Sequence, residues 1–158
     1  MSPRLAVLLK ALLVCGAVVA LDQLTKGLVR EHIGRAETVE VLPFLDLENT
    51  RNRGIAFGLA GDVSPVLIGI AIGLLVATLA FVMLRGEPRP LVWLPAGLLL
   101  GGALGNLIDR IRDGAVTDFI ELPNWPTFNL ADVSITVGVV LLVLLPEVTR
   151  GRKEPRTE

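Results

Sequence analysis

Two aspartates, Asp118 and Asp132, stand at the edges of apolar segments in a chain that is otherwise rich in hydrophobic residues. Charge at membrane depth is costly, so an ionisable side chain there is a candidate for function. Two carboxylates that share one proton can activate water, because the ionised one removes a proton from water while the protonated one donates to a carbonyl oxygen. The pair is therefore a candidate for amide hydrolysis, provided that the fold brings the two side chains together.

The composition is that of a membrane protein. Of 158 residues, 52% are hydrophobic, and the mean hydropathy of +0.64 lies above that of a usual soluble domain. The net charge of -1 and the lack of a Lys/Arg run exclude a nucleic-acid-binding footprint. The single cysteine, Cys15, excludes an internal disulfide and metal sites with several thiolates. We expect no metal and no other cofactor.

Four apolar runs predict an all-α integral membrane protein with four transmembrane helices, over 5–25, 63–84, 91–110 and 129–149. The run 63–84 carries no charge, and by itself it is long enough to cross a hydrocarbon core of about 30 Å. Residues 1–150 are predicted to form one membrane domain, followed by a polar cytoplasmic tail over 151–158.

Features within these runs refine the prediction. Asp132 should lie in the first turn of the last helix, where the helix dipole favours its ionised form. Gly101 and Gly105 form a small-residue pair that suits close helix contact. The first run could instead be a cleaved signal peptide preceded by Arg4, but it continues beyond Cys15 as far as Leu21.

The distribution of Lys and Arg predicts the orientation. The N-terminus, the 85–90 loop and the tail are denser in these residues than the segments 22–62 and 109–132. By the positive-inside rule, both termini are cytoplasmic. The polar clusters then gather on the outer face, which predicts a site there, although the polar ends of unrelated helices would give a similar pattern.

Two connecting segments have distinctive patterns. Alternation over 38–42 and 44–48 predicts short strands, and thus a small extracytoplasmic sheet or flap between the first and second helices. We expect a short interfacial helix over 55–60. The segment 121–126 contains two prolines and an asparagine, which predicts a turn that brings Asp118 beside the start of the last helix.

Five segments within residues 22–135 together resemble the motifs of the lipoprotein signal peptidases, or signal peptidase II. Each is weak alone, but five in order at compatible spacing are specific. Arg53 stands where the family has smaller polar residues, so its side chain is given no role. The segments are Asp22-Gln-Leu-Thr-Lys26, Asn52-Arg-Gly-Ile-Ala-Phe57, Gly105-Asn-Leu-Ile-Asp-Arg110, Val116-Thr-Asp-Phe-Ile120 and Phe128-Asn-Leu-Ala-Asp132.

The resemblance implies an aspartic endopeptidase of the bacterial cytoplasmic (inner) membrane. Its substrate would be a prolipoprotein whose cysteine carries diacylglycerol, and cleavage just before that cysteine would release the signal peptide. Membrane lipids and cyclic peptide inhibitors of the globomycin type are further expected partners.

The family motif places the catalytic roles on Asp118 and Asp132, and a structural motif on Asp22 and Lys26. We expect Asp109 and Arg110 to pair with each other or with groups such as Asn106, fixing the loop that carries Asp118. The positions that would bind substrate or support the site are Asn52, Gly54, Asn106, Asp109, Arg110, Asn129 and Ala131.

Two alternatives belong to other functional classes. A small transporter could use Asp22, Asp118 and Asp132 as proton or cation sites. Such a protein should carry acids near mid-span, whereas these acids cluster at one predicted face. A membrane scaffold is the second alternative, and its function should survive Asp118→Asn.

Overall fold

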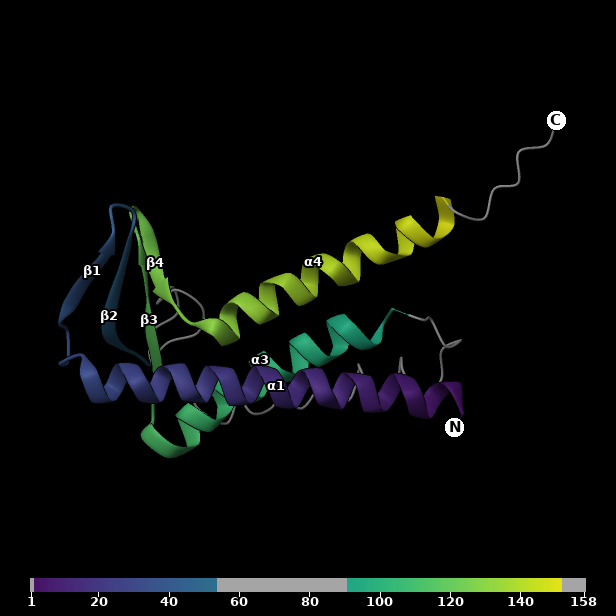
Figure 1. The fold of residues 1–158 in the computed structure, drawn as a ribbon, viewed down its shortest axis with the longest axis horizontal. Helices are drawn as coiled ribbons and strands as arrows, with labels where there is room; N and C mark the ends of the chain where they lie inside the picture. Colours follow the sequence, from purple (N-terminus) through teal and green to yellow (C-terminus); the bar gives the residue numbers. More distant parts are fainter. Residues whose placement is uncertain (1, 54–90, 152–158) are drawn as a thin grey trace.

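The computed structural model describes residues 2–53 and 91–151, with side chains described as far as residue 144. These residues form helices and a small antiparallel sheet, and Figure 1 shows the sheet at one end of the helices. The start of α1 and the end of α4 lie at the opposite end. The elements are α1 (Pro3–His32), β1 (Thr38–Leu42), β2 (Leu45–Asn52), α3 (Trp93–Asp113), β3 (Val116–Leu122), β4 (Trp125–Phe128) and α4 (Leu130–Gly151).

The helices begin and end at recognisable signals. The Ser2 side chain caps α1 by accepting a hydrogen bond from the Leu5 N–H at 3.3 Å, and Pro3 occupies the first turn, where no N–H partner is needed. Gly114 ends α3 with a left-handed φ of 68°. Helices thus occupy the places predicted for the first, third and fourth spans, while the predicted span 63–84, the short helix 55–60 and Gly54 lie outside the described residues.

Within the described residues, α1 is the one helix long and apolar enough to cross a membrane, and α4 contains a shorter apolar stretch, Leu130–Leu144. Both helices expose large apolar side chains, among them Leu13 and Val143. Such a surface suits contact with lipid rather than water. Four membrane spans remain a prediction.

Glycines allow α3 to pack closely against both α1 and α4. A Cβ atom at Gly101 would lie 2.7 Å from the Cβ of Val18 on α1, and one at Gly102 would collide with the carbonyl oxygen of Ala131 on α4. A Cβ at Gly105 would lie 2.6 Å from Asp22 Oδ2. The predicted close helix contact at these glycines is confirmed.

The sheet has the strand order β1-β2-β3-β4, with every neighbouring pair antiparallel. The strand predicted over 38–42 is confirmed as β1, and the alternation over 44–48 marks part of β2. The prediction was wrong about the extent of the sheet, because two further strands, β3 and β4, follow α3. The fold is therefore not all-α. The start of β3 is buried at four successive positions, so it lacks period-two alternation.

The predicted turn is present but tighter than expected. It joins β3 to β4 through Pro123 and Asn124, and Asn124 has a φ of 60°, which asparagine tolerates better than most residues. Pro126 argues against a strand in sequence, yet β4 is an edge strand within the described sheet, where proline is acceptable. The hairpin leads directly into α4, so the chain does fold back between Asp118 and Asp132.

A small apolar cluster holds the sheet against the helices. Val29 and Ile33 from the end of α1 are buried against Phe119 of β3. Leu47 of β2 and Leu130 at the start of α4 pack on the same cluster. This contact fixes β3 and the start of α4, the two elements that carry the aspartates.

Candidate active site

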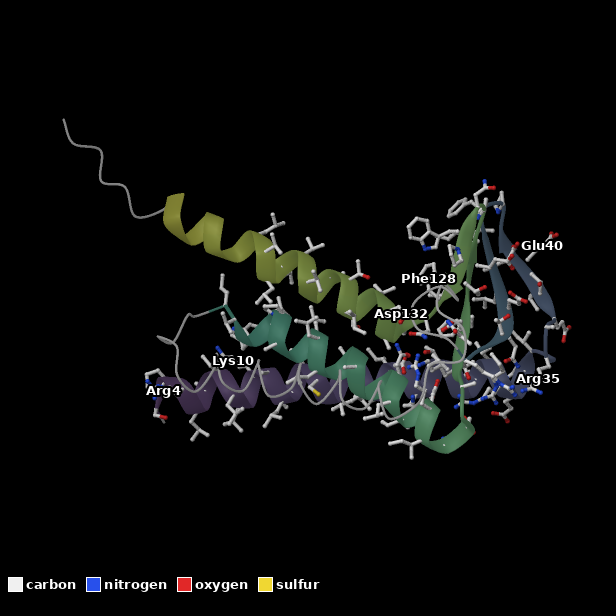
Figure 2. All side chains as sticks on the ribbon, turned by 180° about the vertical axis from the view of Figure 1, so that it is seen from behind. Arg4, Lys10, Arg35, Glu40, Phe128 and Asp132 are labelled. Carbon is white, nitrogen blue, oxygen red and sulfur yellow. The ribbon has the colours of Figure 1, made fainter. Side chains whose placement is uncertain are left out.

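Asp118 and Asp132 both lie at the junction between the helices and the sheet. Asp118 lies on β3, an interior strand, and Asp132 lies in the first turn of α4. Asn129 connects them: its Nδ2 donates to Asp118 Oδ1 at 2.6 Å, and its backbone N–H donates to Asp132 Oδ2 at 3.2 Å. Figure 2 shows Asp132 at this junction, where polar side chains gather, and Arg4 and Lys10 at the far end of the helices.

Asp132 is held by a reciprocal cap at the start of α4. The backbone N–H of Asp132 donates to Asn129 Oδ1 at 3.0 Å, while Asp132 Oδ2 accepts the Asn129 N–H. This is a capping box in which an aspartate takes the usual place of glutamate. The arrangement fixes the carboxylate and places it where the helix dipole favours negative charge, as the sequence predicted.

Asp118 has a different environment. Its side chain is buried, and burial raises the pKa of the carboxyl from the ordinary 3.8 to about 6. Hydrogen bonds from Asn52 and Asn129 favour the ionised form, whereas the negative charge of Asp132 favours the protonated form. The Asn52 contact, Nδ2 to Asp118 Oδ2, is 2.9 Å long. Asp118 is therefore suited to hold a proton near neutral pH.

Asn106 on α3 connects this pair to the rest of the protein. Its Nδ2 donates to Asp132 Oδ1 at 2.8 Å. Its Oδ1 accepts from Asn129 Nδ2 at 3.2 Å and from Lys26 Nζ at 2.9 Å. The Asn106 side chain thus contacts one aspartate directly and the other through Asn129.

Lys26, Asp22 and Asp109 form a buried ionic cluster next to the aspartate pair. Lys26 Nζ is 2.8 Å from Asp22 Oδ2 and 3.1 Å from Asp109 Oδ2, and the three side chains have no solvent exposure. Asp22 Oδ1 also accepts the backbone N–H of Ala131 at 3.0 Å. Asp109 Oδ2 accepts the backbone N–H of Thr117 at 3.1 Å. The cluster joins α1, α3, α4 and β3. It therefore fixes Ala131 and Thr117, the residues that precede Asp132 and Asp118.

The partners of Asp109 and Arg110 refine the expected pairing. Asp109 pairs with Lys26, which the sequence did not indicate. Arg110 donates through Nη1 to the backbone oxygen of Asn106 at 3.3 Å. A contact with Asn106 was one of the expected alternatives. The charge of Arg110 also interacts with Asp132, with Asp118 and, as the other expected alternative had it, with Asp109.

Sequence reasoning gave no role to three residues of this network. Gln23 Nε2 donates to Asp109 Oδ1 at 3.0 Å and to the Gly105 carbonyl at 3.1 Å. Arg30 Nη1 donates to Thr117 Oγ1 at 3.0 Å. A usable signal existed for Arg30, because positions four apart on a helix share a face, and Arg30 is four residues beyond Lys26. Gln23 and Thr117 carry no comparable signal.

Among the described residues, no group of three His, Cys, Asp or Glu side chains is arranged to hold a metal ion. The chemistry that the site can supply comes from its paired carboxyl groups: one is buried and suited to hold a proton, and the other is held at a helix start. Such a pair can activate a water molecule and polarise a carbonyl group.

The fold has counterparts among solved membrane enzymes. A structure described as a bacterial membrane enzyme at 2.3 Å is 32% identical, with a TM-score of 0.82 and 94% of each chain covered. A second, at 1.9 Å, is 31% identical, with a TM-score of 0.77 and coverage of 85% of this chain and 90% of the other.

The sequence relatives are more specific. The family model described as signal peptidase (SPase) II matches residues 14–146. A lipoprotein signal peptidase of Moorella thermoacetica is 42% identical over 146 residues, covering 90% of this chain and 97% of the relative. Another, of Syntrophotalea carbinolica, is 42% identical over 142 residues, covering 84% and 88%. The chain belongs to the signal peptidase II family, a family of membrane peptidases, and the predicted resemblance is confirmed.

Proposed function

We propose that this chain is an aspartic endopeptidase that removes signal peptides from diacylglyceryl-modified prolipoproteins by cutting just before the lipidated cysteine. Asp118 and Asp132 are the catalytic pair. The observation that carries the proposal is their common contact with Asn129 at the junction of the helices and the sheet. Membership of a peptidase family argues against the transporter and scaffold alternatives.

The mechanism assigns one proton to the pair. Asp132, whose carboxylate accepts hydrogen bonds from Asn106 and from the Asn129 N–H at the start of α4, removes a proton from water, and the resulting hydroxide attacks the carbonyl carbon of the scissile bond. Asp118, which is suited to hold a proton, donates it to the carbonyl oxygen. When the tetrahedral intermediate collapses, the proton taken up by Asp132 passes to the departing nitrogen, and the carbonyl oxygen returns its proton to Asp118.

The neighbouring amides have supporting roles in this mechanism. Asn52 and Asn129 each donate to Asp118, so they fix its carboxyl plane and balance its preference for the proton. Asn106 donates to Asp132 and so fixes the oxygen of the base. Preorganised donors of this kind reduce the reorganisation that the reaction requires.

The placement of the site suits a lipidated substrate. Two acyl chains would hold the substrate cysteine at the membrane surface. Asp118 on β3 and Asp132 in the first turn of α4 belong to the elements that meet where the helices join the sheet. We propose four spans with both termini cytoplasmic, which puts the sheet and the site at the outer face of the inner membrane. Cyclic peptides of the globomycin type would compete for the same site.

A matched pair of substrates tests this function. The purified protein, supplied with lipid, is given a prolipoprotein with a diacylglyceryl cysteine and the same chain without the lipid. Gel shift and mass spectrometry of the products should show cleavage of the modified substrate alone, directly before the cysteine. Equal cleavage of both substrates, cleavage elsewhere, or no cleavage by folded protein would contradict the proposal.

A further inference from the structure

Lys26 is a fully buried cation whose contacts exceed those needed for an ion pair. An ammonium group without solvent is costly unless each of its donors has a partner. Lys26 Nζ has three partners: Asp22 Oδ2 at 2.8 Å, Asp109 Oδ2 at 3.1 Å and Asn106 Oδ1 at 2.9 Å. The third is not an acid but the amide that contacts Asp132, so Lys26 lies one side chain away from the catalytic pair.

The contact with Lys26, the shorter of the two that Asn106 Oδ1 accepts, helps to fix which way the Asn106 amide points; Asn129 Nδ2 donates to the same oxygen at 3.2 Å. An asparagine side chain has an acceptor oxygen and a donor nitrogen of similar shape, so its neighbours decide its orientation. An ammonium group can only donate, and it therefore holds Oδ1 of Asn106 on its own side. Nδ2 is then directed at Asp132 Oδ1, 2.8 Å away. With the amide reversed, an oxygen would face the carboxylate of the base.

The balance of charge around the pair gives Lys26 a second effect. In the described residues, four acids interact with one another through three cations. The acids are Asp22 on α1, Asp109 on α3, Asp118 on β3 and Asp132 on α4. The cations are Lys26 and Arg30 on α1 and Arg110 on α3. The charges cancel when the pair of aspartates carries one proton.

Other charged groups lie at the margin of this cluster. Asp113 on α3 is 3.9 Å from Arg30 Nη1, 3.5 Å from Arg51 Nη1 and 3.6 Å from Arg112 Nε, and it is partly exposed. Solvent screens these pairs, so they affect the aspartate pair less than the buried groups do. Lys26 is the fully buried cation nearest to Asn106 among the described residues.

We propose that Lys26 is a positioning residue of the peptidase: it holds the Asn106 amide toward Asp132 and supplies the buried positive charge that keeps the catalytic pair at one shared proton. The proposal rests on the proposed function, since it needs Asp118 and Asp132 to act as a pair. Its two effects support the same protonation state, in which one carboxylate is ionised and one is not.

The test is the pH dependence of kcat for lipidated substrate cleavage by the full-length enzyme. The parent should give a bell-shaped profile whose limbs report the two ionisations of the pair. In Lys26→Met, a buried positive charge is lost, and both limbs should move to higher pH by about one unit. The maximal kcat should fall, with KM near that of the parent, because Lys26 has no place in substrate binding.

Asp22→Asn supplies the matched charge control, because it removes a negative charge and leaves an oxygen able to accept the Ala131 N–H. Its limbs should move to lower pH. The double variant Lys26→Met/Asp22→Asn restores the balance, and its limbs should return toward the parent. Thermal unfolding in the same lipid shows which variants are folded.

The outcomes separate the two proposals. If the parent does not cleave, the proposed function fails. If the parent cleaves but the limbs of folded Lys26→Met stay in place, Lys26 is only structural and the inference is wrong. If Lys26→Met does not fold, Asp22→Asn decides: a downward shift of the limbs supports charge control, and unmoved limbs overturn it.

Discussion

At the residue scale, two chemically identical side chains differ because their surroundings differ. Asp118 is buried on an interior strand, and Asp132 is held at a helix start by its cap. Both could be singled out from the sequence, and the position of Asp132 in the first turn is confirmed. The link through Asn129 could not be derived from residue types, because it depends on how the β3–β4 hairpin returns to α4.

The raised pKa of Asp118 predicts how stability varies with pH. A carboxyl whose pKa rises on folding stabilises the folded state while it is protonated, and that contribution is lost as pH rises from about 4 through about 6. The shift corresponds to about 3 kcal/mol as an order of magnitude. Asp118→Asn stays neutral at every pH, so its unfolding temperature relative to the parent should rise between pH 5 and pH 8.

Thermal unfolding at the two pH values measures this difference. Asp46→Asn on β2, outside the buried cluster, is the control, and its difference from the parent should not follow the same course. A difference between Asp118→Asn and the parent that is the same at both pH values would show that Asp118 does not retain its proton as described.

At the element scale, close helix packing sets the position of the first turn of α4. The sequence indicated the glycine pair on α3, but it did not indicate that Gly102, between the two, faces the backbone of Ala131. The strands β3 and β4 were missed for physical reasons, since burial removes the alternation of one and a proline interrupts the other. Local patterns therefore predicted each of the helices in the described residues and only half of the sheet.

Gly102→Ala tests this packing. The added Cβ would collide with the Ala131 carbonyl, so the start of α4 must move together with Asp132. We expect a loss of about 1–3 kcal/mol in the free energy of unfolding and at least a tenfold loss of kcat. Gly16→Ala is the matched control on α1, because a Cβ there meets nothing within 4 Å. Equal behaviour of the two variants in unfolding and cleavage assays would contradict this role of Gly102.

At the scale of the whole molecule, contacts between distant segments hold the site together. The hydrogen bond from the Ala131 N–H to Asp22 spans 109 positions in the sequence, and that from Lys26 to Asn106 spans 80. Such pairings follow from tertiary packing and have no local signal. The family motifs nevertheless named every one of these residues, although they did not say which of them touch.

The arrangement predicts opposite exposure of the two ends of the molecule. In a Cys15→Ala background, Glu40→Cys on β1 should react with a membrane-impermeant maleimide in intact cells, because the sheet is proposed to lie outside. Ser2→Cys at the start of α1 should react only after the membrane is permeabilised. The reverse pattern of labelling would show that the proposed orientation is wrong.

The most direct test of the central claim is cleavage of a diacylglyceryl-modified prolipoprotein by the parent and by folded Asp118→Asn and Asp132→Asn variants, with Asp46→Asn as the control. The aspartate pair predicts that each of the first two variants loses about a thousandfold or more in kcat, while Asp46→Asn retains the parent rate. Near-parental cleavage by either folded variant at Asp118 or Asp132 would contradict the account.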